Sequence, residues 1–275
     1  MCIHIHMSIN IHTKKKEGKK NMKIIAISNQ KGGVGKTTTA TNVAYGLQLR
    51  GKKVLLIDSD PQGNSTDTWR AKNTDGYPTL SDLLFSNEPV EECIQHTEIG
   101  DILAGDPILE DAEKHLKGVA GYFRLKNRLA PLEGKYDYVI IDTPPNLGLL
   151  LQNALIAADG VIVPVTCGRY SLQGMSRFIE TVNEVKAQPN PDLKIYGLLL
   201  VRYIGHTLLA KDVVEGLPTL TTELGTDVFD SKIRNTIEVE KAQAARVPLE
   251  QYSPESTAAI DYMEFIDELE KRGII

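Results

Sequence analysis

The sequence predicts an α/β fold with a doubly wound, mostly parallel sheet of about seven or eight strands and helices on both faces. Four short runs are apolar nearly throughout and rich in β-branched residues, which indicates buried parallel strands at 23–28, 53–58, 138–142 and 160–165. Helical patterns alternate with these runs, as in right-handed βαβ crossovers. No internal repeat or low-complexity linker interrupts residues 22–275, so we expect one domain there.

The remaining elements follow the same alternation. Two later strands are expected at 195–201 and 227–233. Helices are expected at 38–49, 110–130, 147–158, 171–187, 208–224 and 255–271. In the last helix, an apolar stripe at helical spacing should pack on the sheet; it consists of Ile260, Met263, Ile266 and Leu269. The polar face of this helix is mostly Asp and Glu, which argues against binding to anionic lipid.

Composition excludes several classes of protein. The chain has 275 residues, of which 41% are hydrophobic, and this is enough for a sizeable core. Its three cysteines, Cys2, Cys93 and Cys167, show no CxxC spacing and no histidine at metal-ligand spacing, so we expect neither disulfides nor a zinc site. No run reaches the ~18 apolar residues of a membrane span, and no secretory signal is visible. We therefore expect a cytoplasmic protein.

Residues 1–21 differ from the rest of the chain. They hold five lysines and one glutamate, a charge of +4, which leaves −9 on the remainder of a chain whose net charge is −5. We expect a disordered basic tail or a misread start codon, and the alternative is a basic arm that touches nucleic acid or an anionic membrane. The acidic body does not exclude DNA as a partner, because attraction to phosphates depends on local clusters of Lys and Arg.

Three of the predicted strands end in polar loops, with the sequences SNQKGGVGKT, DSDPQGNST and DTPPNLG. In doubly wound sheets, ligands bind at the carboxyl ends of the strands. We therefore expect these three loops to converge on one site.

The first loop predicts a site for a nucleoside triphosphate. Its glycines let successive backbone N–H groups turn inward and let phosphate oxygens approach closely. Lys36 is expected between the β- and γ-phosphates, Thr37 should offer its hydroxyl to Mg²⁺, and the helix that starts near Thr38 should point its positive end at the anion. The expected nucleotide-binding residues of this loop are Gly32, Gly33, Val34, Gly35, Lys36, Thr37 and Thr38.

This loop departs from the common pattern G-x-x-x-x-G-K-[ST], because Gln30 stands where that pattern has its first glycine. The string K-G-G-x-G-K-T stands in its place. It brings a second lysine, Lys31, to the mouth of the loop.

The other two loops supply carboxylates. Asp60 is expected to orient the attacking water or to hold a water of the Mg²⁺ shell, since phosphoryl transfer depends on positioning and charge neutralisation. Asp142 closes an apolar strand and is expected to bind Mg²⁺, directly or through water. Pro144, Pro145 and Gly148 make a loop that can sense the γ-phosphate and switch when it leaves.

Taken together, the segments NQKGGVGKTT, DSDPQGN and IIDTPP resemble the deviant Walker A ATPases of the ParA/MinD family, and the ParA (Soj-like) partition branch in particular. The resemblance extends from Met22 almost to the C-terminus. It implies a P-loop NTPase fold, Mg²⁺-dependent hydrolysis of ATP, and a homodimer with ATP sandwiched between its subunits. It also implies a catalytic role for Lys31, which would reach the nucleotide of the other subunit and act as an arginine finger does.

The resemblance further implies that the ATP dimer binds non-specific DNA on the nucleoid and that a centromere-binding, ParB-like partner stimulates hydrolysis during plasmid or chromosome segregation. The basic residues expected at the DNA surface are Arg202, Lys211, Lys232, Arg234 and Arg246. Glu238 stands where the Soj-like pattern has an arginine, so the DNA footprint must differ in detail. Arg234 has a second interpretation, as a residue that lines the nucleotide base.

Two alternative functions stay open at this point. One is a nucleotide-gated DNA-binding regulator with incidental ATPase activity, and the other is another positioning ATPase of the ParA/MinD type. The 21 residues before Met22 are too few for a helix-turn-helix module, which argues against sequence-specific repression by this chain alone.

Overall fold

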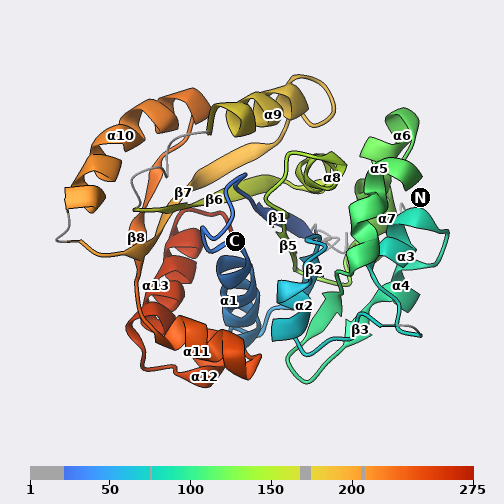
Figure 1. Ribbon diagram of the computed structural model, residues 1–275, viewed down its shortest axis with the longest axis horizontal. Helices are drawn as coiled ribbons and strands as arrows, with labels where there is room; N and C mark the ends of the chain where they lie inside the picture. Colours follow the sequence, from blue (N-terminus) through green and yellow to red (C-terminus); the bar gives the residue numbers. More distant parts are fainter. Residues whose placement is uncertain (1–21, 75, 168–174, 206–207) are drawn as a thin grey trace, which may run out of the picture.

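The computed structural model describes residues 22–74, 76–167, 175–205 and 208–275 and shows a doubly wound sheet (Figure 1). Eight strands form this sheet in the order β3-β4-β2-β5-β1-β6-β7-β8. Neighbouring strands are parallel, except for β3 and β4 at one edge, which pair antiparallel. The predicted fold class is confirmed. The basic segment 1–21, with Cys2, lies outside the described residues, as do residues 171–174 of one predicted helix.

All six predicted strands are present, with ends that differ by at most two residues. They are β1 (Lys23–Ile27), β2 (Val54–Asp58), β5 (Tyr138–Asp142), β6 (Gly160–Thr166), β7 (Lys194–Tyr203) and β8 (Val228–Arg234). Two further strands, β3 (Gln95–His96) and β4 (Asp101–Leu103), are too short for a side-chain period to be visible in sequence. Because β2, β5 and β1 are neighbours, the loops that follow them leave the sheet side by side.

Helices cover both faces of the sheet (Figure 1). One face carries α1 (Lys36–Leu49), α2 (Asn64–Thr68), α11 (Glu238–Ala245), α12 (Leu249–Tyr252) and α13 (Thr257–Lys271). The other face carries the longer helices α8 (Leu149–Ala157), α9 (Met175–Ala187) and α10 (Leu208–Leu224). Beside them lie the short helices α3 (Leu80–Phe85), α4 (Val90–Cys93), α5 (Ala112–His115), α6 (Gly118–Tyr122) and α7 (Arg124–Leu129), with the 3₁₀ turns η1 (Pro107–Asp111) and η2 (Ala130–Leu132).

The single helix predicted over 110–130 is wrong, because the segment divides into several short helices. Gly118 has φ +64°, in the left-handed region that favours glycine. At Gly121, a Cβ would lie 2.8 Å from the backbone of Leu116, so the chain folds back closely on itself. One continuous helix cannot make that reversal.

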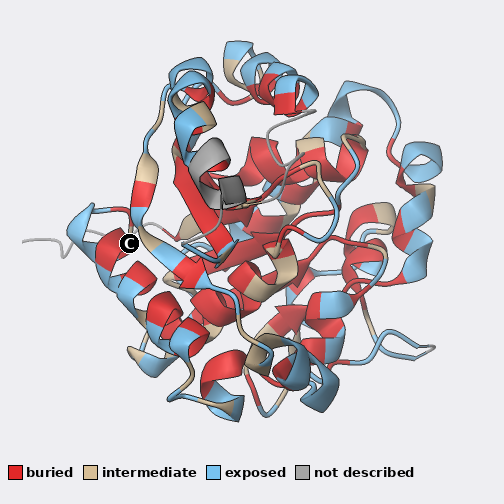
Figure 2. Cartoon of the chain, turned by 60° about the vertical axis from the view of Figure 1, so that its left-hand side comes forward, coloured by how far each residue is buried: buried red, intermediate tan, exposed pale blue. Residues whose placement is uncertain are grey.

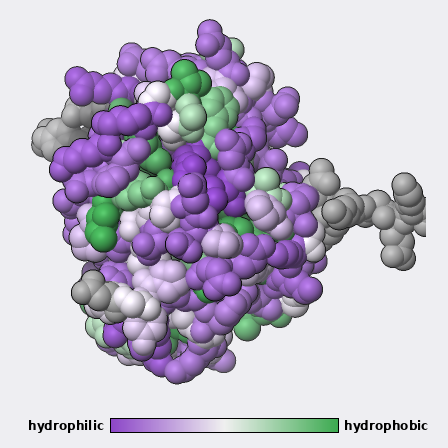
Figure 3. All heavy atoms as spheres, turned by 90° about the vertical axis from the view of Figure 1, so that its right-hand side faces the viewer, coloured by the Kyte–Doolittle hydropathy of each residue, from purple (hydrophilic) through white to green (hydrophobic). Residues whose placement is uncertain are grey.

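The outer face that carries α3 to α7 is mainly hydrophilic, with apolar side chains interspersed (Figure 3).

The core consists of two layers, one on each side of the sheet. Along β1, Ile25 and Ile27 belong to the layer beneath α1 and α13, whereas Ala26 belongs to the layer beneath α8 and α9. Strands β2 and β5 alternate in the same way, and every residue of both is buried. Burial on both faces explains why the strands are apolar without interruption. Buried residues accordingly fill the sheet and the inner helix surfaces (Figure 2).

The last helix, α13, buries the predicted stripe except for its first residue, and Met263 is partly buried against the core. Ile266 and Leu269 are fully buried, as expected, but Ile260 is 43% exposed. The helix packs against α1 and β8, and the ring of Phe265 meets Phe229 of β8 edge-on at 4.9 Å. None of the described helices is both long and apolar enough to cross a membrane.

Replacing Phe265 with alanine should lower the free energy of unfolding by about 3–5 kcal/mol, because it removes a fully buried aromatic side chain and leaves a cavity. Urea unfolding followed by circular dichroism measures this change. Ile260→Ala, on the same helix but half-exposed, is the matched control and should change stability by less than about 0.5 kcal/mol. Equal losses for the two variants would contradict this packing of α13.

Candidate nucleotide-binding site

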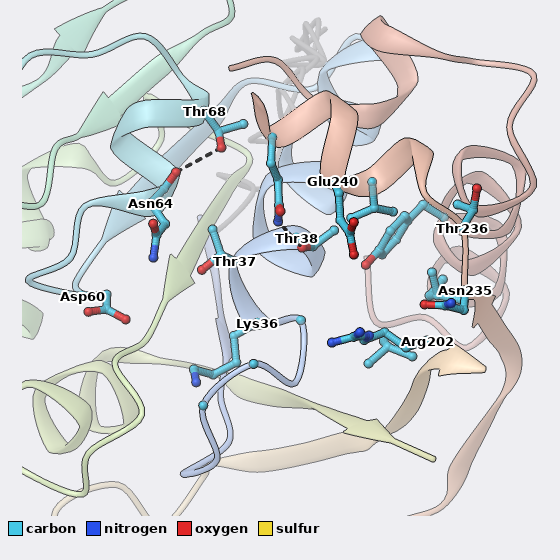
Figure 4. A pocket seen from close by; sticks show the side chains of 18 of the residues that line it. Lys36, Thr37, Thr38, Asp60, Asn64, Thr68, Arg202, Asn235, Thr236 and Glu240 are labelled. Atoms are coloured by element: carbon cyan, nitrogen blue, oxygen red, sulfur yellow. Dashed lines mark hydrogen bonds between the residues drawn. The ribbon is translucent and has the colours of Figure 1, made fainter. Parts of the chain in front are cut away.

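A cavity of about 620 Å³ opens at the carboxyl ends of the central strands (Figure 4). Its wall includes residues from the loops after β1, β2 and β5, so the three predicted loops meet there. The ends of β7 and β8 and helix α11 complete the wall, which sequence patterns do not indicate. The volume lies within the range of small-molecule sites in proteins.

The loop after β1 takes a conformation that requires glycine. Gly33 and Gly35 have φ values of +71° and +77°, which residues with a Cβ adopt only at a cost. Gly35 is the N-cap of α1, so the helix begins at Lys36. The first N–H groups of this helix have no partner within it, and the helix dipole makes its N-terminus attractive to anions.

Lys36 is a buried cation, with only 6% of its surface exposed. Its ammonium group donates to the backbone carbonyl of Lys31 at 3.1 Å, which uses one of its three donors. Burial lowers the pKa of Lys36, whereas the charges of Asp142 and Asp60 act to raise it. A buried positive charge at the floor of an open cavity suits a polyanionic ligand.

Asp58 and Asp142 lie side by side at the ends of β2 and β5, and both are fully buried. Asp58 accepts hydrogen bonds from the N–H and the hydroxyl of Thr66 at 2.7 and 2.8 Å, and from the N–H of Asp60 at 3.2 Å. Burial, and then the charge of Asp142, raises the pKa of Asp58. Asp58 thereby fixes the loop that presents Asp60.

Asp142 has a different environment. Its Oδ2 atom accepts from the Ser65 hydroxyl at 2.8 Å, but its Oδ1 atom is buried without a hydrogen bond to any described residue. Burial raises the pKa of Asp142, while the hydrogen bond from Ser65, the nearby Thr37 hydroxyl and the charge of Lys36 lower it. An unpartnered carboxylate oxygen beside a threonine hydroxyl fits a hard, oxygen-seeking cation such as Mg²⁺.

Within the described ranges, no cluster of three or more His, Cys, Asp and Glu side chains is placed to hold a metal ion. This agrees with the way Mg²⁺ binds at nucleotide sites, through one or two protein groups together with phosphate oxygens and water. Thr37 and Asp142 are the residues that fit it.

Asp60 lines the cavity and is 8% exposed. Its Oδ1 atom accepts from the N–H of Gln62 at 3.1 Å, and its carboxylate lies across an open space from Thr37 and Lys36 (Figure 4). Gly105 supports this turn from behind, because a Cβ there would lie 2.8 and 2.9 Å from the carbonyl oxygens of Asp58 and Asp60. Gly105 is separated from the turn in sequence, so no local motif indicates its role.

Lys31 has its backbone fixed and its side chain outside the cavity wall. Its N–H donates to the side chain of Asn29 at 3.0 Å, and Asn29 in turn donates to the carbonyl of Pro164 at 2.8 Å. The carbonyl of Lys31 faces Lys36. The described residues that line the cavity include Lys36 but not Lys31.

Glu113 of α5 is a further residue that sequence reasoning missed. Its Oε1 atom accepts from the N–H of Leu149 at 3.0 Å, the first residue of α8. This bond ties the loop after β5 to a helix from a different crossover. No spacing or motif could have indicated it, because the two residues belong to separate elements.

Comparison with known proteins identifies the family of this chain. Residues 22–195 match the family profile described as an AAA domain. The chain is 38% identical over 253 residues to the chromosome partitioning protein ParA of Myxococcus xanthus, which covers 91% of this chain and 88% of that protein. It is 37% identical to the sporulation initiation inhibitor protein Soj of Bacillus subtilis, with 91% and 99% covered. The chain belongs to the ParA family.

Solved structures show the same architecture. A cobyrinic acid a,c-diamide synthase from Mycobacterium smegmatis with bound ADP and magnesium superposes with a TM-score of 0.78 at 33% identity, covering 92% of this chain and 96% of that one. A plasmid partition protein from Borrelia burgdorferi bound to AMPPNP has a TM-score of 0.77 at 27% identity, with 91% and 99% covered.

The basic residues that the ParA resemblance assigns to DNA lie in different environments. Arg234 lines the cavity and is held by Asp261, with an ion-pair distance of 2.6 Å. Arg246 forms an ion pair with Asp67, also at 2.6 Å. Both guanidinium groups are therefore already engaged by carboxylates.

The other three predicted DNA residues share no common partner. Lys232 places its ammonium group 5.1 Å from the ring centre of Tyr203. Arg202 lines the cavity. Lys211 belongs to α10, and its side chain lies outside what the structure describes. Their roles on DNA stay a prediction.

A buried carboxylate lies behind the cavity of this ParA-family chain. Glu250 of α12 is 7% exposed, and neither of its oxygens has a hydrogen bond to a described residue. Burial raises the pKa of Glu250 to about 8. Burial, and to a smaller extent the charge of Glu250, also raises the pKa of Tyr262, which lines the cavity and shares a hydrogen bond with Thr39 at 3.1 Å.

Replacing Glu250 with methionine should make the stability of the protein less dependent on pH. The folded-state pKa of about 8 lies above the ordinary value of 4.5, so the stability contributed by the neutral acid is present below pH 4.5 and is lost as pH rises through 8. Relative to wild type, Glu250→Met should gain roughly 4 kcal/mol more at pH 9 than at pH 5. Chemical denaturation at both pH values measures this, with exposed Glu255→Met as the control. An equal gain at both pH values would argue that Glu250 does not titrate in this range.

Proposed function

We propose that this chain is a ParA-type partition ATPase, which binds ATP with Mg²⁺, hydrolyses it to ADP and phosphate, and uses the cycle to segregate plasmid or chromosomal DNA. One observation carries the proposal. Lys36, Thr37 and Asp60 line one cavity, and the buried Asp142 lies behind them, close enough to act on Lys36 and Thr37, in a chain that is 38% identical to a chromosome partitioning protein along 91% of its length.

The phosphate chain of ATP binds to the loop after β1. The backbone N–H groups of residues 32–38 and the N-terminus of α1 supply donors, and Lys36 supplies a charge that its burial leaves poorly solvated. Binding an anion should therefore raise the pKa of Lys36, because it opposes the effect of burial. Thr37 and Asp142 hold Mg²⁺, which when bound neutralises charge on the phosphate oxygens.

Hydrolysis requires a water placed in line with the γ-phosphate. Asp60 is the carboxylate that orients this water, since its loop is fixed by Asp58 and Gly105 and its carboxylate faces the cavity. The water oxygen forms a bond to the γ-phosphorus, and the bond from that phosphorus to the β,γ-bridging oxygen breaks.

Lys31 completes the site of a second subunit in an ATP-dependent homodimer. Its side chain does not line the cavity of its own subunit, while its carbonyl holds Lys36 in place. A cation that arrives only on dimerisation stabilises the charge that develops during phosphoryl transfer. Hydrolysis would then be confined to the assembled dimer.

The ATP dimer binds non-specific DNA on the nucleoid in the cytoplasm, and a ParB-like centromere-binding protein stimulates turnover and release. Kinship with the Myxococcus ParA and with the Borrelia plasmid partition protein supports this part of the proposal. Residues 22–275 act as one ATPase domain. Sedimentation with Mg²⁺-ATP or Mg²⁺-ADP tests the proposal, with and without duplex DNA at two salt concentrations: a dimer that forms only with ATP and binds DNA in a salt-sensitive way is expected. A monomer that ignores nucleotide and DNA would refute it.

Asp60→Ala should slow ATP hydrolysis by about 100-fold while leaving ATP-dependent dimerisation intact, because the water loses its orienting carboxylate but the phosphates keep their ligands. Phosphate release and sedimentation velocity measure the two properties on the same sample. Asp192→Ala, an exposed aspartate outside the cavity wall, is the control and should behave as wild type. Normal turnover in Asp60→Ala would remove Asp60 from this role.

Lys31→Ala and Lys36→Ala should separate the two lysines of the loop. Lys36→Ala should weaken ATP binding by about 100-fold or more, since the phosphates lose a buried cation. Lys31→Ala should bind ATP with nearly normal affinity as a monomer but form a weaker dimer with slower turnover. Titration with a fluorescent ATP analogue, followed by light scattering, distinguishes them. If Lys31→Ala loses nucleotide as severely as Lys36→Ala, then Lys31 is a ligand within its own subunit.

A further inference from the structure

We propose that Arg202, at the end of β7, binds the nucleotide of its own subunit and that its guanidinium neutralises the phosphate chain from the side of the loop opposite the tip of Lys36. The inference rests on the proposed function, because it assumes that the cavity takes a nucleoside triphosphate. It gives Arg202 a role different from the DNA contact that the family resemblance suggests.

The end of β7 is fixed against the phosphate loop. A Cβ on Gly35 would lie 3.5 Å from a methyl group of Val201, so the strand end is in contact range of the residue that caps α1. Arg202 follows directly and lines the cavity. Its guanidinium points toward the loop from the side opposite Asp60 (Figure 4).

The backbone of Arg202 interrupts the alternation of β7. Leu199 and Val201 face the layer beneath α1, so the next side chain of a regular strand would face the opposite layer. Arg202 instead has φ +52°, in the left-handed region that is uncommon for residues other than glycine. Tyr203, one residue later, packs against that opposite layer, which leaves Arg202 at the strand end facing the cavity.

Arg202 differs from the neighbouring arginines in its partners. Arg234 is held by Asp261 and Arg246 by Asp67. The guanidinium of Arg202 has no ion pair or hydrogen bond with any described residue. A strained, exposed arginine at a cavity wall, free of the carboxylates that hold its neighbours, is available to an anionic ligand.

Phosphate chemistry suits this position better than DNA does. A guanidinium presents two parallel donors that match the oxygens of a phosphate group. Arg202 lines a cavity of about 620 Å³, which is the size of a small-molecule site and too small to admit a DNA duplex. With Lys36 on one side of the loop and Arg202 on the other, the phosphate chain would meet a cation from both directions.

The test compares Arg202→Met and Arg202→Lys with wild type by titrating Mg²⁺-ADP and Mg²⁺-ATP into the full chain and measuring affinity by calorimetry. ADP isolates binding within one subunit, because dimerisation requires ATP. Arg202→Met should bind both nucleotides about tenfold more weakly, and Arg202→Lys should restore part of the affinity, because it keeps the charge but not the two parallel donors. Lys194→Met is the matched control: this exposed cation at the other end of β7 does not line the cavity, so its loss should change neither affinity.

Unchanged nucleotide affinity in Arg202→Met would overturn the inference, and so would a loss that lysine does not restore. Binding of duplex DNA at saturating ATP separates it from the DNA assignment: Arg202→Met should retain DNA, and a loss of DNA there would place Arg202 on the DNA surface. Lys36→Ala reports on the proposed function separately. If Lys36→Ala also keeps its nucleotide, the cavity assignment fails, and not merely the role of Arg202.

Discussion

Two carboxylates buried at the ends of adjacent parallel strands set the conditions for the rest of the site. Parallel register places Asp58 beside Asp142. Both are buried, and the negative charge of each raises the free-energy cost of ionising the other. The two carboxylates differ in their hydrogen-bond partners. Asp58 receives its hydrogen bonds from Thr66 and Asp60, whereas Asp142 keeps one oxygen without a partner. The first carboxylate therefore builds the loop, and the second is left for a cation.

The phosphate loop is the counterpart of this buried negative charge. Lys36, the first residue of α1, brings the compensating charge, and burial lowers its pKa, so the ammonium group and the carboxylates depend on one another. The carbonyl of Lys31 is turned toward that ammonium group, and Asn29 fixes the peptide that carries it. The geometry that anchors one lysine thus also sets where the backbone presents the other.

Sequence reasoning was most successful where the signal is local. The strands that end in the three loops are continuous apolar runs. In the loop after β1, the glycine pattern predicted a backbone that only glycine adopts easily, and Gly33 and Gly35 have positive φ. The rest depends on contacts between segments that are distant in the chain. Gly105 supports the turn at Asp60, and Asp261 of α13 holds Arg234 of β8, and neither relation has a spacing that a pattern can reveal. The break of the helix at 110–130 was visible only as two glycines, and the close packing of Gly121 against Leu116 cannot be seen in the sequence.

The hydrogen bond from Leu149 to Glu113 gives the loop after β5 two anchors, one at each end. At one end the loop continues from β5, the strand that carries Asp142, and at the other end its hydrogen bond to Glu113 holds it to α5. Only residues 143–148 lie between these anchors, so a large displacement of this loop would have to break the hydrogen bond to Glu113. Release would free a carboxylate on the outer surface and loosen α5 with it. A change in the loop after β5 would thereby alter the outer surface at α5, at a distance from the cavity.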